Sequence, residues 1–218
     1  MKNIVVLEML NNGEIDTLKA LLQDEIYKDN LNGNPGAEKR YKAMERYIKA
    51  STNWTAKGRE DFHKPCKVTV CGKEYYSFID GYCIALTTES IGRIPEYDNS
   101  ENTYFKVEKI ITFDGTMEEI NVNKILAEAK SRGYKWKKSE LGNDVNFNYI
   151  FKYKDGYFKV GLLDMAYSII DDGEEAEVCY KGNKDLLTIK TSVGIAAILP
   201  VNDKDEDIES RKTVIYVE

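Results

Sequence analysis

The chain has 218 residues and a mass of 25.0 kDa, enough for one large domain or two ordinary ones, and its 42% hydrophobic and 31% charged residues are typical of a globular protein. A net charge of −6 argues against a uniformly basic nucleic-acid-binding protein. No stretch has the roughly 18 uninterrupted apolar residues of a membrane span, and four irregularly spaced cysteines without an export signal favour a cytoplasmic protein with reduced thiols.

The N-terminal segment predicts a strand and two helices. Residues 3–9, NIVVLEM, form a short apolar run that we expect to be a strand. Apolar residues at helical spacing predict a helix over about 14–27. The segment DNLNGNPG is rich in turn formers and predicts a loop, after which a second helix should cover residues 37–51.

The predicted helix over 37–51 has two different faces. Its apolar face, which should pack on the core, comprises Ala37, Tyr41, Met44 and Ile48. Its opposite, basic face comprises Lys39, Lys42, Arg46 and Lys49. Residues 37–59 hold seven basic and two acidic residues, a local charge of +5. Such a stripe is usually a solvated helix face, but it also suits contact with phosphates.

A meander of three strands is predicted next, over residues 67–70, 74–78 and 83–88. Residues 71–72 should form a tight turn. Residues 80–82, Asp-Gly-Tyr, should form a polar corner between the second and third strands, because glycine tolerates a positive φ and aspartate can bond its own backbone.

The middle of the chain predicts a loop over 89–102, a strand over 104–113 and a helix over about 119–132. Asn121 is the expected cap of this helix. The buried stripe of the helix should comprise Val122, Ile125, Leu126 and Ala129. The helix ends in a basic cluster of Lys130, Arg132, Lys135, Lys137 and Lys138.

The C-terminal segment predicts a strand over 146–153, a buried helix over about 161–171 and an antiparallel meander. The meander should use residues 176–180, 186–191 and 195–201. An acidic run and a last strand over 213–217 should follow. The aromatic residues on one face of the strand over 146–153 could stack bases but favour a core position; they are Phe147, Tyr149, Phe151 and Tyr153.

Catalytic and metal-binding patterns are absent from the sequence. A single histidine, no phosphate-binding glycine loop and no paired metal carboxylates argue against an enzyme, and we expect neither a cofactor nor a metal. A zinc site at His63, Cys66 and Cys71 would need a further ligand pair, and odd spacing points the two thiols to opposite faces of a strand.

Two segments carry a resemblance to a known family. The stretch GYFKVGLLDMAYSIIDDGEEAEVCYKGNKDLLTIKTSVGIAAILPV, residues 156–201, resembles the end of the bacterial replicative sliding clamp, the beta subunit of DNA polymerase III. The stretch IDGYCIAL, residues 79–86, is similar to a corner of that clamp, although Ile79 and Cys83 replace its threonine and arginine. The resemblance covers about a quarter of the chain plus the corner.

The resemblance implies a docking groove and a DNA-contacting surface. Partner proteins such as polymerases would insert linear motifs into a groove of Gly81, Tyr82, Cys83, Ile84, Leu199, Pro200 and Val201. Duplex DNA would be contacted without sequence specificity by the basic face of the helix over 37–51 and by the basic cluster at 130–138. A chain of this length could close a ring only as a homo-oligomer.

We therefore expect an α+β protein with antiparallel sheets backed by helices, in clamp-like repeats. Residues 1–115 would form one unit with extra helices, 116–202 a second unit, and 203–218 an acidic linker and terminal strand. The expected function is that of a DNA-binding processivity protein in DNA replication. The alternatives are a clamp-fold protein-interaction module of a mobile element that has lost DNA encirclement, and a small hydrolase with an unconventional site.

Overall fold

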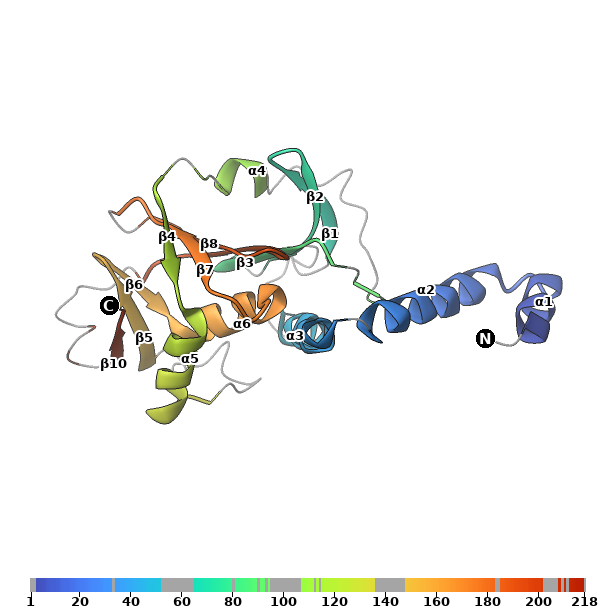
Figure 1. Ribbon diagram of the computed structural model, residues 1–218, viewed down its shortest axis with the longest axis horizontal. Helices are drawn as coiled ribbons and strands as arrows, with labels where there is room; N and C mark the ends of the chain where they lie inside the picture. The colour runs from blue at the N-terminus through green and yellow to red at the C-terminus, as the bar shows by residue number, and fades with distance from the viewer. Residues whose placement is uncertain are drawn as a thin grey trace.

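The protein is an α+β structure with one large antiparallel sheet, one small sheet and covering helices (Figure 1). The computed structural model describes residues 3–32, 34–51, 65–79, 81–89, 91–92, 94, 107–111, 113, 115–135, 148–182, 185–201, 208, 210 and 212–217.

The large sheet has seven strands, and every neighbouring pair is antiparallel. In spatial order they are β1 (Cys66–Val70), β2 (Lys73–Ile79), β3 (Cys83–Thr87), β9 (Gly194–Ile198), β8 (Leu187–Lys190), β7 (Ala176–Cys179) and β4 (Met117–Ile120). Both predicted meanders are therefore confirmed. The strand β4 was not predicted as such, because the predicted helix over 119–132 begins later, at Val122.

The large sheet contains two similar halves. In the first half, α3 (Pro35–Ser51) is followed in the chain by β1, β2 and β3; in the second, α6 (Val160–Ile170) is followed by β7, β8 and β9. The last strands of the two halves pair antiparallel, with Ala85 opposite Ala196, and the two helices pack against each other. The sheet thus joins strands from both predicted units, 1–115 and 116–202.

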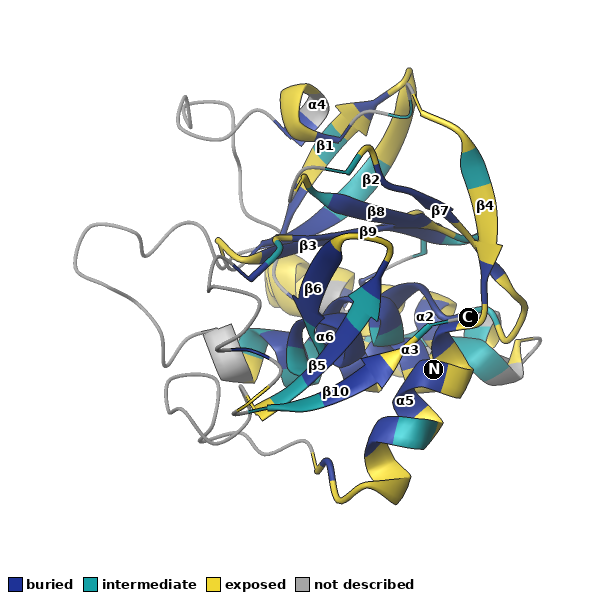
Figure 2. Cartoon of the chain, turned by 90° about the vertical axis from the view of Figure 1, so that its left-hand side faces the viewer, coloured by how far each residue is buried: buried dark blue, intermediate teal, exposed yellow. Residues whose placement is uncertain are grey.

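Helix α6 lies at the centre of the protein. Figure 2 shows it in dark blue beneath the large sheet, and the helix packs on both β3 and β9. Its sequence VGLLDMAYSII is mostly apolar, as expected of a helix that is buried over most of its surface. Close packing is possible because Gly194 lies beside it: a Cβ there would be 2.5 Å from Ile170 Cγ2 and 2.2 Å from the Leu86 carbonyl oxygen.

The small sheet has the order β10 (Thr213–Tyr216), β5 (Tyr149–Tyr153) and β6 (Gly156–Lys159). β5 and β6 form a hairpin whose turn holds Lys154 at φ +53°, and β10 pairs parallel to β5. Phe151 and Phe158 stack at 5.4 Å between ring centroids. The aromatic face of β5 therefore belongs to the core, as expected, although Phe147 lies outside the described residues.

The other face of the large sheet carries a smaller core. It includes Val70, Ile84, Leu86 and Ile195 and is covered by α4 (Val107–Ile110), which lies across the sheet from α3 and α6 (Figure 1). The prediction of a strand over 104–113 was wrong, since 107–110 are helical. A short apolar run fits a strand or a helix equally well, so that tertiary contacts decide.

The N-terminal run was also predicted wrongly. Residues 3–9 belong to α1 (Asn3–Asn11), a helix that packs on α2 (Ile15–Asn32). The predicted helix over 14–27 is confirmed as α2, but it continues through four residues of the predicted loop. The next helix, α3, starts at Pro35, and proline is favoured at the first helical position. Together α1 and α2 form an arm that projects from the body (Figure 1).

Helix α5 (Val122–Ser131) has the cap and the buried stripe that the sequence predicted, although it begins later than predicted. The Asn121 side chain accepts a hydrogen bond from the Lys124 N–H at 2.8 Å, which caps the helix. The predicted stripe is buried: Val122, Ile125, Leu126 and Ala129. Amphipathic spacing and a cap residue were enough to identify this element because both signals are local.

Candidate docking site

The predicted corner and the predicted terminal segment lie side by side. β3 pairs with β9 so that Cys83 faces Ile198, and just beyond this pair the Leu199 N–H donates to the Tyr82 carbonyl at 3.0 Å. Gly81 has φ +88°, a backbone conformation that glycine adopts more easily than other residues. Glycine therefore suits the turn at this position. Asp80 lies outside the described residues.

The terminal segment also connects the two sheets. Pro200 forms an isolated bridge with Phe158 of β6, and the Val201 N–H donates to the Tyr157 carbonyl at 2.8 Å. The chain after β9 therefore leaves the large sheet and is held by the small one. Backbone hydrogen bonds on both sides fix Leu199 and Pro200 in position.

The exposed part of this region is smaller than the predicted groove. Cys83, Ile84 and Val201 are buried and serve the core. Gly81 is exposed and Pro200 is half-buried. Tyr82 and Leu199, in contrast, are 49% and 43% exposed, large apolar side chains on adjacent backbone segments.

A cation lies at the edge of this surface. The Lys159 ammonium is 5.8 Å from the centroid of the Tyr82 ring, a distance at which a cation and an aromatic ring attract each other. We use the name docking corner for Tyr82, Lys159, Leu199 and Pro200. The docking corner thus combines an aromatic ring, a leucine, a proline and a positive charge on fixed backbone.

Three of the four residues on the basic face of α3 are exposed to solvent, and the fourth, Arg46, is half-buried. Lys42 and Lys49 are exposed, and Lys42 pairs with Glu38 on the same helix. Lys39 is exposed as well, but its ammonium reaches the end of α6 and lies 2.6 Å from Asp171 Oδ2. Arg46 donates to the Ser168 hydroxyl on α6 at 3.1 Å. Two of the four predicted residues therefore contact the core helix.

The basic cluster after α5 is also divided. Lys130, Arg132 and Lys135 are exposed. Arg132 pairs with Glu128 and donates to the Val214 carbonyl of β10 at 3.1 Å. Lys137 and Lys138 lie outside the described residues.

The apolar face predicted for α3 is confirmed, because Tyr41 and Met44 are buried and Ala37 and Ile48 are partly buried.

Arg40 is a residue whose role the sequence did not reveal. Its side chain is 2% exposed, donates to both carboxylate oxygens of Glu89 and also reaches the Asp171 carbonyl at 2.8 Å. It ties α3 to the end of β3 and to the end of α6. The only sequence signal is its place next to the apolar face of α3, and its partner lies 49 positions away in the chain.

The Asp171 carboxylate is held in its charged form. Burial alone raises its pKa, but hydrogen bonds from Lys39 and Asn123 outweigh burial and leave the pKa lower than that of an ordinary aspartate. The neighbouring Asp172 has a lowered pKa as well, since the Ser192 hydroxyl and N–H bind its carboxylate and outweigh burial. These carboxylates fix the end of α6 rather than form a reactive pair.

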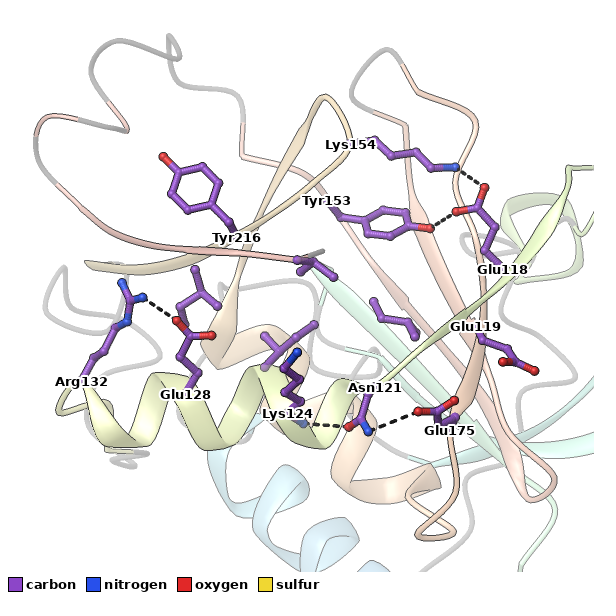
Figure 3. A pocket seen from close by; sticks show the side chains of 14 residues that line it. Glu118, Glu119, Asn121, Lys124, Glu128, Arg132, Tyr153, Lys154, Glu175 and Tyr216 are labelled. Carbon is purple, nitrogen blue, oxygen red and sulfur yellow. Dashed lines mark hydrogen bonds and ion pairs between the residues drawn. The ribbon is translucent and has the colours of Figure 1, made fainter.

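A cavity of about 800 Å³ lies between α5, β4 and β10 (Figure 3). Several of its charged groups are paired: the Glu118 carboxylate accepts hydrogen bonds from Lys154 and Tyr153, both at 2.7 Å, and these bonds lower its pKa. Asn121 donates to Glu175 at 3.4 Å. Such paired groups stabilise the junction between the two sheets.

The described part of the chain offers no metal site. No three His, Cys, Asp or Glu residues within it gather closely enough to hold an ion. Cys66 is buried against the Ser77 hydroxyl at 3.1 Å, Cys71 is exposed in the turn after β1, and His63 lies outside the described residues. Among the described helices, none combines the length and hydrophobicity of a membrane span.

Comparison with protein-family models, with curated proteins and with solved structures gives no match.

Proposed function

We propose that this protein is a non-enzymatic docking protein that binds an extended peptide of a partner at the docking corner. The observation that carries the proposal is the hydrogen bond between the Leu199 N–H and the Tyr82 carbonyl, which places two segments 117 positions apart on one surface. Exposed apolar side chains on fixed backbone are the usual anchors of protein interfaces.

The chemistry of the docking corner suggests the kind of peptide. Tyr82 and Leu199 offer apolar contact to aliphatic or aromatic side chains, and an acidic residue would complement Lys159. Tyrosine loses little conformational entropy when it is buried, which makes it a common binding anchor. The expected ligand is therefore a short motif with an apolar pair and a neighbouring carboxylate.

The scaffold proposed for this function is a clamp-like pair of repeats. Two halves of helix and three-stranded meander are joined through β3 and β9 and through α3 and α6. This arrangement agrees with the resemblance of residues 156–201 and 79–86 to the bacterial sliding clamp. The docking function favours the alternative of an interaction module, because α6 bears no basic residue and Arg46 of the basic face of α3 contacts its side.

The test is a selection of displayed ten-residue peptides on the full chain, followed by affinity measurement. Selected peptides should bind Tyr82→Ala and Leu199→Ala at least tenfold more weakly, a change of about 1.4 kcal/mol each. Tyr216→Ala is the matched control, since Tyr216 is 59% exposed on β10 and should leave affinity unchanged. The proposal would be contradicted if the selected peptides bound Tyr82→Ala and Tyr216→Ala with the same affinity as wild type.

A second candidate, contact with duplex DNA, is favoured by the exposed lysines at positions 39, 42, 49, 130 and 135 and by the exposed Arg132. If the protein contacts DNA phosphates, its affinity for DNA should fall steeply as the salt concentration rises. Retention on closed circular DNA but not on linear DNA, with a native mass that increases to that of an oligomer, would support a sliding clamp. Unchanged binding by Lys42→Glu combined with Lys49→Glu would argue against it.

A further inference from the structure

A small cavity lies where the arm meets the body, between α2 and α3 (Figure 1). Its volume is about 190 Å³. A cavity of about 150 Å³ can hold benzene, so this one admits a molecule of about six to eight non-hydrogen atoms. The described residues that line it come from α2, from α3 and from the segment after β3, and include Tyr27, Leu31, Ala37, Tyr41, Met44 and Glu89. A ligand in this cavity would therefore contact the arm and the body at once.

Two buried tyrosine hydroxyls at this cavity have no hydrogen-bond partner. Tyr27 and Tyr41 are each 7% exposed, and neither hydroxyl reaches a donor or an acceptor in the described chain. Buried polar groups are nearly always hydrogen-bonded, because the loss of their bonds to water is unfavourable unless it is replaced. Each hydroxyl can donate one hydrogen bond and accept two. A polar ligand in the cavity would supply the partner that both hydroxyls lack.

The two tyrosine rings are held in fixed positions. Their centroids are 4.2 Å apart, with 40° between the ring planes. Gly92 packs on both rings, since a Cβ at this glycine would lie 3.0 Å from Tyr27 Cγ and 3.1 Å from Tyr41 Cε2. The ring pair therefore has little freedom to lose when a ligand binds beside it, and such preorganisation favours binding.

The electrostatic surroundings of the cavity favour a cation. Glu89 is the one charged residue among the described residues that line it. Arg40 donates to both oxygens of Glu89, but a carboxylate can accept about four hydrogen bonds, which leaves sites for a ligand. Burial raises the pKa of the Tyr27 hydroxyl, and electrostatic repulsion by neighbouring groups raises this pKa further; these are Tyr41, Glu45, Glu89 and Glu38. The phenol is therefore neutral, and an anionic ligand would be repelled.

We propose that this cavity binds a small alkylammonium ion. An ammonium group carries three N–H donors, which suit the two phenol oxygens and the remaining lone pairs of Glu89. The aromatic rings attract its positive charge, and its carbon chain would contact Leu31, Ala37 and Met44. Because Tyr27 and Leu31 belong to α2, the ion would strengthen the attachment of the arm to the body. This site is separate from the docking corner and does not depend on it.

The primary test is calorimetric titration of the full chain with three probes of similar size: n-butylammonium, n-butanol and butyrate. n-Butylammonium should bind with a dissociation constant of about 1 mM or lower, an affinity that five non-hydrogen atoms can provide. n-Butanol should bind at least about tenfold more weakly, and butyrate should not bind. The proposal would be overturned if the amine did not bind at about 50 mM, so that the cavity holds only water, or if the alcohol bound equally well.

Removal of one hydroxyl separates a binding role from a structural role. Tyr41→Phe keeps the ring and deletes the unpartnered hydroxyl, so it should be at least as stable as wild type in urea and bind n-butylammonium about fivefold more weakly. The matched control is Tyr47→Phe, since Tyr47 is fully buried on the same helix but is not among the residues that line the cavity. Tyr47→Phe should keep the wild-type affinity. A loss of stability in Tyr41→Phe with unchanged affinity would assign its hydroxyl to the fold and overturn the proposal.

The alkylammonium group could come from a free amine or from a lysine side chain of another protein. Nα-acetyl-lysine amide carries the same four-carbon ammonium chain on a backbone, so equal or tighter binding than n-butylammonium would identify lysine, and exclusion would identify a free amine. In both cases the bound ion should slow hydrogen exchange of the α2 amides near Tyr27. Unchanged exchange at saturation would contradict a site that joins the arm to the body. The docking corner is intact in these variants, so the two proposals fail separately.

Discussion

The guanidinium of Arg40 is buried although its helix otherwise presents its basic side chains mainly to solvent. Arg40→Ala would leave the Glu89 carboxylate and the Asp171 carbonyl without this donor. Breaking a buried ion pair from one side costs about 3 to 5 kcal/mol. We therefore expect Arg40→Ala to lower the free energy of unfolding by that amount, measured by urea denaturation.

The control for Arg40 is a cation on the same helix. Lys42 and Glu38 form an exposed pair, and such pairs contribute less than about 1 kcal/mol. Lys42→Ala should therefore hardly change the urea midpoint. If both alanine variants lose the same small amount of stability, Arg40 is not the junction between α3, β3 and α6 that its contacts indicate.

Asp171 predicts a dependence of stability on pH. Because its pKa is lower in the folded protein than in the unfolded chain, the stability that it contributes is present above the unfolded pKa, near 4, and is lost as pH falls through the folded pKa. Asp171→Asn keeps the shape but loses the charge opposite Lys39. The difference in unfolding free energy between wild type and Asp171→Asn should therefore stay constant above about pH 5 and shrink as the pH falls from there through the folded pKa. A difference that also stays constant below about pH 5 would contradict the assignment.

The sequence predicted the site residues unevenly. The resemblance to a known family placed Gly81 and Leu199 in one surface, and the Leu199 hydrogen bond to Tyr82 agrees with it. The roles of Lys39 and Arg46 were not predictable, because a helical pattern gives the direction of a side chain but not the helix that lies opposite. Which basic residues are solvated depends on the packing of α3 on α6.

At the scale of elements, replacing glycine by alanine should change the stability of the protein in opposite directions at two positions. Gly194→Ala would place a Cβ 2.2 Å from the Leu86 carbonyl and force β3, β9 or α6 to move, a change that costs about 1 to 3 kcal/mol or more. Gly161 lies in α6, and its nearest neighbour for a new Cβ is the Tyr134 hydroxyl at 3.9 Å. Gly161→Ala should raise stability by up to about 1 kcal/mol, because alanine favours helix.

Thermal unfolding of these two variants provides the check. The melting temperature should fall for Gly194→Ala and rise for Gly161→Ala relative to wild type. A variant with Gly194→Ala that melts at the wild-type temperature would mean that the strands near Leu86 and the helix at Ile170 are less tightly packed than the distances indicate.

The elements that the sequence predicted correctly carry local signals. α5 has a cap at Asn121 and an apolar period, and both meanders consist of short strands between turn formers, of which β3 and β9 are apolar and buried along their whole length. α1 and α4 carry only short apolar runs, and their state depends on what lies beside them: α2 for the first, the outer face of the large sheet for the second. Such partners are distant in sequence or in another layer, so that no local pattern reports them.

At the scale of the whole molecule, the two halves share one core. A single cluster of buried side chains includes Tyr47 and Phe78 from the first half and Ile189 and Ala196 from the second. The contacts between β3 and β9 and between α3 and α6 cross the boundary between the predicted units. Neither half could lose its structure without exposing apolar surface of the other, which favours one cooperative unfolding transition.

Hydrogen exchange tests this cooperativity. Phe78 is 1% exposed in the first half and meets Tyr47 edge to face at 5.6 Å between ring centroids, so Phe78→Leu should destabilise the protein by on the order of 1.4 kcal/mol. In one cooperative unit, the amide of Ile189 in the second half should then exchange about tenfold faster, as should protected amides near Phe78. Thr69→Ser, on the exposed side of β1, should leave both rates unchanged. Faster exchange confined to β1, β2 and β3 would instead show that the two predicted units unfold independently, and that the strand pairing between β3 and β9 joins them without coupling their stability.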